Sequence, residues 1–512
     1  MAFGPVLRGT ATCIGFRQGF RGALGSIRPA NVRKSLLASL LGRCQWLVIE
    51  ETYVDREYTA GYYIQGGKAF SPREKNVRRV HFFADDVTGG RRGEEAVDFL
   101  ESLLDSSDLE SSNQLQRAYL GFAVVRPDHG TLGRTFISPP NGPTRNPSYH
   151  GAQTRFRVSL MGHRLVVVAC PFIEQDQQVM ACASASLWMA TTPVSMKDEH
   201  SQGHSTAEIT RLANGMQRGY SPTIGGAGLS YDQMSHALIE MGYDPFGLEW
   251  PEPVSLKKII AAYSDSGFAP LLIVRLDDDP SIPKGSVHVV TVVGHLDGAG
   301  QYMLKKGENE ISELPEHVKD LIIHDDQQGL YLQADIGPHG TGKWSRVDFT
   351  HRTREGRLGG RIISIMIPIP NRIMTDVVAV ISLAETRLKF ARESRLPDRS
   401  VRIRPILARS RDYKEALPPS MPDELKQLYR RLPMPRYVWL VEFSFVDEIG
   451  SSSQKVFGEL LIDSTSPTLS RTDFLSEHFL GGVAGTAISG HEFEPFNLPI
   501  PDARYEAFHP RA

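Results

Sequence analysis

The first third of the chain alternates polar segments with short runs of β-branched and aromatic residues, a pattern typical of strands. These runs cover residues 46–50, 78–83, 119–126 and 165–169. Between them, residues 94–104 repeat their apolar side chains at helical spacing, so a helix is predicted there. The pattern predicts an N-terminal α+β unit.

Helix start signals dominate the next segment. Ser205 and Ser230 are each followed three residues later by Glu208 or Gln233, the spacing of a capping box. We expect a third helix to begin at Ser255. Strand-like runs follow at residues 269–275, 287–294 and 321–324. Helices that precede a sheet favour an α+β arrangement over alternating βαβ units.

The last quarter of the chain combines a helical pattern at residues 374–385 with two strand patterns at 437–445 and 456–463. The two strand patterns flank a polar segment and predict a hairpin. We therefore divide the chain into four parts. These are a basic, flexible arm (1–45), an N-terminal α+β domain (46–169), a central domain (170–367) and a C-terminal α+β domain (368–512).

The 512 residues carry a net charge of −2, which excludes a global basic field for nucleic acid. An arginine-rich stretch at residues 387–411 has no interleaved aromatic residue other than Phe390, so we interpret it as a solvated face or as one with intramolecular acidic partners. No run approaches the length of an apolar membrane span, so no membrane is expected as a partner. Nothing in the sequence sets an oligomeric state.

The first 49 residues contain six arginines and Lys34 but no acidic residue. This composition fits an organellar transit segment, a flexible basic arm or an upstream extension from a misplaced start codon. Elsewhere, the four cysteines include no CxxC pair, so neither a disulfide framework nor a structural zinc site is expected. A reducing, cytoplasmic location fits this cysteine usage.

One cysteine stands in a position suited to catalysis. Cys182 lies where a glutamine-rich run meets an apolar helix pattern, and the backbone N–H groups at a helix N-terminus stabilise a thiolate. His288 opens a strand pattern about a hundred residues later. An imidazole can take the thiol proton and return it to a leaving group, provided that an acceptor holds the ring in one orientation. Asp325 is the first candidate for that acceptor, and Asp326 is the alternative.

Residues 170–335 resemble the papain-like fold, in particular the branch of double-glycine leader peptidases and phytochelatin synthases. The resemblance rests on the order of a glutamine, Cys182, the sequence His-Val-Val from His288, and an aspartate at the end of the following strand. It implies a papain-like central domain and a thiol peptidase that cleaves a peptide or isopeptide bond in a protein or peptide substrate.

A glutamine amide beside the cysteine backbone N–H stabilises the oxyanion in this family. Gln175 lies seven residues before Cys182 and Gln177 five, whereas six is the usual spacing. We favour Gln175, and Gln177 and Gln178 remain alternatives. The expected catalytic residues are therefore Cys182, His288, Asp325 and Gln175.

Two other functions stay open. Cys182 can be a buried, inert residue of a papain-like binding protein, or the same thioester can pass its acyl group to an amine instead of water. No cofactor and no metal are expected. We interpret His295 as a strand cap or a solvent-facing residue, His324 as part of a strand-end turn, and the glycine-rich residues 337–344 as a surface loop.

Overall fold

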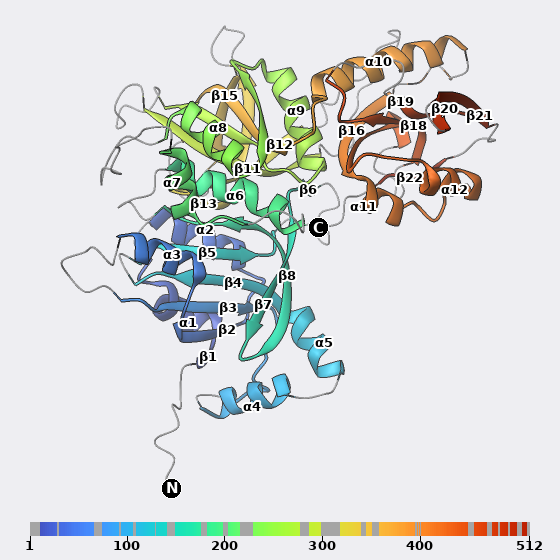
Figure 1. The fold of residues 1–512 in the computed structure, drawn as a ribbon. Coiled ribbons are helices and arrows are strands. Elements are labelled where there is room, and N and C mark those ends of the chain that lie inside the picture. The colour runs from blue at the N-terminus through green and yellow to red at the C-terminus, as the bar shows by residue number, and fades with distance from the viewer. Residues whose placement is uncertain are drawn as a thin grey trace.

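The computed structural model is a mixed α+β fold built on three antiparallel sheets (Figure 1). The structure describes residues 11–27, 30–65, 74–91, 94–105, 109–127, 130–140, 149–175, 182–197, 203–215, 229–276, 286–297, 318–338, 345–350, 358–394, 397, 399, 401–448, 455–467, 474–479, 482–489, 492–498 and 504–508. Among these residues, no helix is both long and apolar enough to cross a membrane.

The N-terminal sheet has the strand order β1-β2-β3-β4-β5-β8-β7. Its strands are Ala11–Gly15 (β1), Trp46–Tyr53 (β2), Val77–Phe83 (β3), Tyr119–Val125 (β4), Leu132–Ile137 (β5), Thr154–Leu160 (β7) and His163–Phe172 (β8). Its helices are Phe16–Leu24 (α1), Ala30–Leu40 (α2), Arg56–Gln65 (α3), Glu94–Asp105 (α4) and Leu109–Ala118 (α5). The predicted strands and the helix at 94–104 are all present.

The described part of the predicted flexible arm is folded, so that prediction was wrong for residues 11–27 and 30–45. Strand β1 pairs with β2 along its whole length, and Phe16, Leu24 and Leu36 are buried. The prediction rested on the basic composition of this segment, but the apolar residues between the basic ones occupy one face of each helix and pack on the sheet. Residues 1–10 lie outside the described residues.

The central sheet contains β6 and β9 to β15. Its strands are Tyr149–Gly151 (β6), Tyr243–Glu249 (β9), Leu271–Arg275 (β10), Val287–Asp297 (β11), Val318–Asp325 (β12), Gly329–Pro338 (β13), Ser345–Thr350 (β14) and Leu358–Pro370 (β15). Strand β10 pairs with both β11 and β15, so the strands from β10 to β15 close into a ring. The predicted boundary near residue 170 is imprecise, because β8 continues to Phe172 and β6 belongs to the central sheet.

Four helices of this region cover the central sheet or extend from it (Figure 1). They are Cys182–Lys197 (α6), Thr206–Ala213 (α7), Tyr231–Glu240 (α8) and Pro253–Asp265 (α9). The capping boxes at Ser205 and Ser230 form as predicted. Helix α9 begins at Pro253 rather than at Ser255, because proline suits the first helical position, where its missing N–H is not needed.

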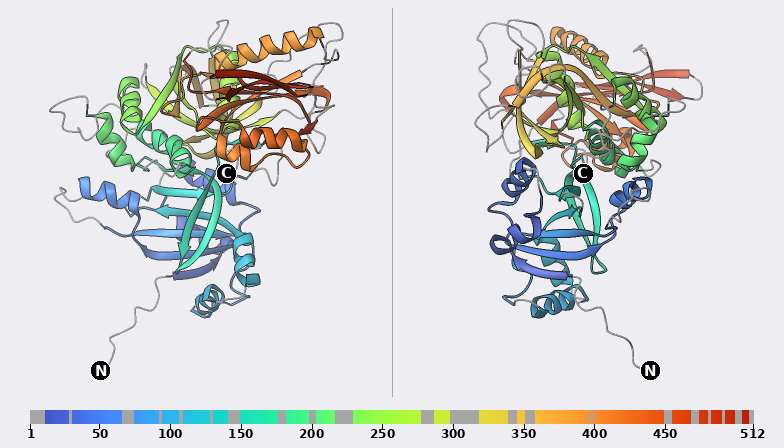
Figure 2. Two further views of the ribbon diagram at one scale, coloured as in Figure 1. Left: turned by 45° about the vertical axis from the view of Figure 1, so that its right-hand side comes forward. Right: turned by 90° about the vertical axis from the view of Figure 1, so that its left-hand side faces the viewer.

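The C-terminal sheet follows helix Val377–Ser394 (α10) and lies beside the central sheet, away from the N-terminal sheet (Figures 1 and 2). Its strands are Val401–Arg409 (β16), Tyr437–Phe445 (β17), Lys455–Asp463 (β18), Phe474–Phe479 (β19), Gly482–Ser489 (β20), Glu492–Leu498 (β21) and Tyr505–Glu506 (β22). Helices Ser410–Glu415 (α11) and Asp423–Arg431 (α12) and the 3₁₀ turn Val446–Glu448 complete this part. The predicted hairpin is the antiparallel pair β17 and β18.

Many arginines of residues 387–411 have carboxylate partners within the chain. These pairs include Arg387 with Glu477, Arg399 with Glu448, Arg404 with Asp265 and Glu442, Arg409 with Asp412, and Arg411 with Glu415. The stretch therefore fits the interpretation of intramolecular acidic partners.

Candidate active site

Helix α6 packs against strand β11, and its first residue, Cys182, interacts with His288 near the start of that strand. Almost every side of the helix is buried, and its alanine and serine side chains allow the backbone to approach the sheet closely. Ser186 Oγ donates a hydrogen bond to Val289 O at 3.1 Å, and Thr291 Oγ1 donates to Ser186 O at 3.4 Å. These bonds hold α6 against β11 beside His288.

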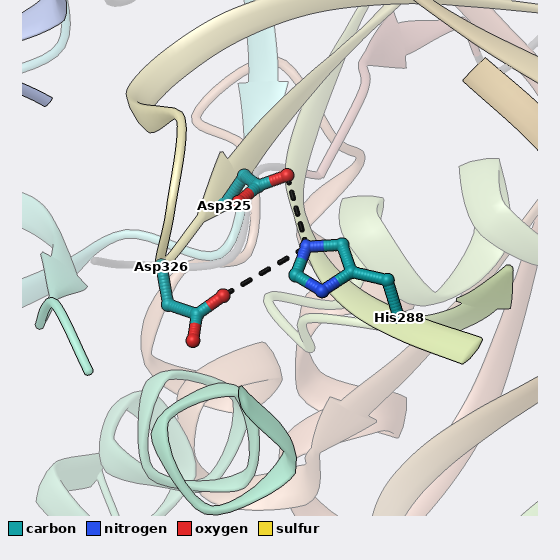
Figure 3. Close-up of side chains that lie close together, drawn as sticks. All are labelled: His288, Asp325 and Asp326. Carbon is teal, nitrogen blue, oxygen red and sulfur yellow. Dashed lines mark hydrogen bonds and ion pairs between the residues drawn. The ribbon is translucent and has the colours of Figure 1, made fainter. Parts of the chain in front are cut away.

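The turn between β12 and β13 holds the two aspartates in different ways. Asp325 Oδ1 accepts the backbone N–H groups of Gln327 and Gln328 at 2.8 and 3.0 Å, which fixes its carboxylate. Its Oδ2 lies 3.0 Å from His288 Nε2. Asp326 Oδ1 lies 3.8 Å from the same nitrogen (Figure 3).

His288 connects these carboxylates to Cys182. Burial alone would lower the pKa of His288, but the charge of Asp325, hydrogen bonds with Asp325 and Cys182, and the charge of Asp326 raise it well above its usual value. Because Nε2 faces the aspartates, Nδ1 is the nitrogen that is left for the thiol. Cys182 is only partly buried, so a substrate or reagent can reach it.

The two neighbouring aspartates differ in their affinity for a proton. Burial raises the pKa of both carboxyl groups. For Asp325, the His288 charge and the hydrogen bonds from His288 and the turn lower the pKa below its usual value. For Asp326, burial dominates and raises the pKa to about 7, with a further contribution from the Asp325 charge. Asp325 is therefore the ionised partner of the imidazolium.

Sequence reasoning missed Glu174. Its side chain is 1% exposed, and burial raises its pKa to about 8 despite a hydrogen bond from Leu132 N at 2.7 Å and the nearby charge of Arg126. The charge of Asp326 also contributes to this shift. No sequence motif marks Glu174, because only the fold brings the end of β8 to the turn after β12.

The structure does not bring every candidate into this cluster. Gln175 follows Glu174 and is partly buried, and its function in oxyanion binding stays a prediction. Gln177 and Gln178 lie outside the described residues, as do residues 339–344 of the glycine-rich loop.

His295 and His324, the other two histidines interpreted from the sequence, are both buried. His295 is 1% exposed, and its Nε2 lies 3.5 Å from Asp265 Oδ1. The expectation of a strand cap or solvent-facing residue was therefore wrong for His295, because α9 covers this part of β11. His324 is fully buried, and its Nδ1 lies 3.0 Å from Pro171 O.

The geometry allows two kinds of chemistry. The series Cys182, His288 and Asp325 has the connections of a thiol nucleophile, its base and the group that orients the base. In addition, one ligand atom each of His288, Asp325 and Asp326 lies within 4.8 Å of the others, so this cluster could hold a metal ion.

No family model matches this chain, and neither does any curated protein sequence.

Proposed function

We propose that the chain is a papain-like cysteine peptidase that cleaves a peptide or isopeptide bond in a protein or peptide substrate. The observation that carries the proposal is the hydrogen-bonded series of Cys182, His288 and Asp325, in which the imidazole has a raised pKa. An imidazolium held beside a partly exposed sulfur at a helix N-terminus favours the thiolate form of that sulfur.

In the proposed reaction, the Cys182 thiolate attacks the substrate carbonyl carbon, and the carbonyl oxygen becomes an oxyanion. The backbone N–H of Cys182 and the amide of Gln175 donate hydrogen bonds to that oxygen. Collapse of the intermediate breaks the C–N bond, and His288 gives its proton to the leaving amine. His288 then takes a proton from water, whose oxygen attacks the thioester and releases the acid and the Cys182 thiolate, so that the ion pair with the imidazolium is restored.

The thiolate is tested by measuring the pH dependence of alkylation by iodoacetamide and locating the label by peptide mapping. Cys13, Cys44 and Cys170 provide internal controls, because they are buried and desolvation raises the pKa of each thiol to about 12. We expect labelling of Cys182 near pH 6 that slows in His288→Ala. Labelling of Cys182 only at strongly alkaline pH would instead favour an inert binding protein.

Peptide cleavage needs a separate measurement, since an activated thiol also serves acyl transfer. Incubation with a mixed peptide library should produce new N-termini in the wild type and none in Cys182→Ala. The same incubation with a small primary amine distinguishes the two outcomes, because acyl transfer yields amide products. Amide products in place of free acids would assign the chain to acyltransferases.

A further inference from the structure

The active-site cluster contains more buried carboxylate than a Cys-His-Asp site needs. Asp326 is fully buried, and neither of its carboxylate oxygens has a hydrogen-bond partner. Burying a carboxylate without a partner is costly. The turn supplies backbone N–H donors to Asp325, and the nearest cation to Asp326 is His288, which already faces Asp325.

Glu174 adds a third carboxylate and an independent observation. Its Oε1 is buried without a hydrogen-bond partner, although its Oε2 accepts the Leu132 N–H. Arg126 lies near Glu174, where its charge lowers the pKa of the carboxyl and its Nη1 donates to Glu174 O at 3.0 Å. Asp326 and Glu174 thus each present a buried carboxylate oxygen without a hydrogen-bond partner, and the charge of Asp326 acts on Glu174.

The distances fit a small metal ion. Two ligand atoms bound at 2.0–2.1 Å to a tetrahedral ion lie about 3.3 Å from each other. His288 Nε2 is 3.0 Å from Asp325 Oδ2 and 3.8 Å from Asp326 Oδ1, so the observed distances lie on either side of that value. Figure 3 shows that both carboxylates point toward the same ring nitrogen.

We propose that His288, Asp325 and Asp326, with Glu174 beside them, form a binding site for a divalent transition-metal ion such as zinc, and that the ion inhibits Cys182. The inhibitory part rests on the proposed function. An imidazole and carboxylates together suit zinc or a neighbouring transition metal better than magnesium or calcium.

Inhibition follows from the position of the ion. A metal on His288 Nε2 replaces the proton there and occupies the lone pair of that nitrogen, which leaves the ring proton on Nδ1. In the proposed reaction this Nδ1 proton must pass to the leaving amine, but a metal-bound ring can release it only by becoming an imidazolate, so it is a much weaker acid than an imidazolium. The thiolate of Cys182 therefore persists while cleavage is blocked. Removal of the ion restores the acid and base function of His288.

Cobalt(II) tests the site without relying on activity, because its visible absorption reports the number and type of ligands. We expect a saturable tetrahedral spectrum with the wild type and the same spectrum with Cys182→Ala, since the thiol faces the other side of the imidazole. Asp326→Asn and Glu174→Gln should each weaken binding by about tenfold or more, because even the loss of an outer partner has such an effect. Asp320→Asn, which changes a carboxylate of β12 whose partner is Gln333, should leave binding unchanged.

Two results would overturn the metal site: no cobalt spectrum in the wild type, or a sulfur-to-metal charge-transfer band that disappears in Cys182→Ala. The second result would mean that the ion binds the thiolate. Retention of full affinity in both Asp326→Asn and Glu174→Gln would also contradict it.

Inhibition is measured as the ratio of peptide-cleavage rates without and with zinc, on a peptide that the wild type cleaves. We expect the rate to fall about tenfold or more in the wild type and to recover with a chelator, whereas the ratio in Asp326→Asn should approach one. If cobalt binds but zinc does not slow cleavage, the inhibitory part is wrong. If cobalt binds and Cys182 is inert without any metal, the proposed function fails and the metal site stands.

Discussion

Asp325 and Asp326 are adjacent in sequence, yet the fold gives them different protonation states. The turn donates two N–H groups to Asp325 and none to Asp326, and His288 lies closer to Asp325. The sequence left the choice between them open, and this geometry favours Asp325 as the carboxylate that orients the base in the proposed site.

This assignment predicts unequal effects of two isosteric changes. In Asp325→Asn, His288 loses its nearest negative charge, so its pKa should fall by about one to three units. The pH at which Cys182 becomes reactive toward iodoacetamide should then change markedly. Asp326→Asn should have a smaller effect on the same profile. A larger effect in Asp326→Asn would transfer the orienting function to that residue.

His324 predicts a loss of stability in mild acid. Burial lowers its pKa to about 3, whereas the unfolded value is near 6.5. Below pH 6.5 the unfolded chain binds a proton that the folded chain does not, so stability decreases as pH falls toward 3. The contribution is about 1.4 kcal/mol per pH unit, or about 2 kcal/mol between pH 7 and pH 5.

Urea unfolding at pH 7 and pH 5 measures this contribution when the wild type is compared with His324→Phe. Phenylalanine keeps the ring contacts with Phe172 and Tyr331 but cannot be protonated. The wild type should lose about 2 kcal/mol more than the variant over this interval. Equal losses would mean that the pKa of His324 is the same in the folded and unfolded chains.

At the scale of elements, helix α2 supports the turn that carries the aspartates. Ser35 Oγ accepts the Leu330 N–H at 3.2 Å, and Asn31 Nδ2 donates to Gln328 Oε1 at 2.9 Å. Gly329 has a φ of +123°, and a Cβ there would collide with the Ser35 side chain. A segment that its composition assigned to a flexible arm thus positions the candidate active site.

We expect Gly329→Ala to displace this turn from α2. The strained φ and the collision should destabilise the protein by about 1–3 kcal/mol and slow alkylation of Cys182 at pH 6. Gly337→Ala is the matched control, because it lies on the same strand and has nothing within contact distance of the added Cβ. Chemical unfolding and the alkylation rate measure the two effects. Equal behaviour of the two variants would refute the support by α2.

At the scale of the whole molecule, a buried ion-pair network joins the central and C-terminal parts. Arg404 on β16 contacts Asp265 of α9 at 2.6 Å and Glu442 of β17 at 3.1 Å, and it also donates to Phe508 O at 2.9 Å. All three charged side chains are almost completely buried. The apolar core likewise continues from the N-terminal sheet to β17.

Arg404→Leu should leave two buried carboxylates without their cation and cost about 3–5 kcal/mol. Because the network joins helix α9 of the central part to the C-terminal sheet, we also expect calorimetry to show a separate, earlier transition for the C-terminal part. Arg411→Leu is the control from the same arginine-rich stretch, where an exposed pair with Glu415 contributes less than about 1 kcal/mol. A similar small loss in both variants would show that the Arg404 network does not join the two parts.

The sequence by itself determined the local elements of this protein, because periodicity and capping act between near neighbours. The strands around 78–83 and 437–445 and the capping boxes at Ser205 and Ser230 needed no distant partner to be recognised. The order of Cys182, His288 and an aspartate was likewise visible, since each residue starts or ends an element.

Tertiary structure alone decided which distant groups share one environment. Glu174, Asp326 and the support from α2 come together because β8, β12 and an N-terminal helix converge in space, and no spacing in the sequence encodes that convergence. Burial and the competition for His288 then give the two adjacent aspartates different proton affinities. These quantities depend on solvent exclusion and through-space charge, which the linear chain does not specify.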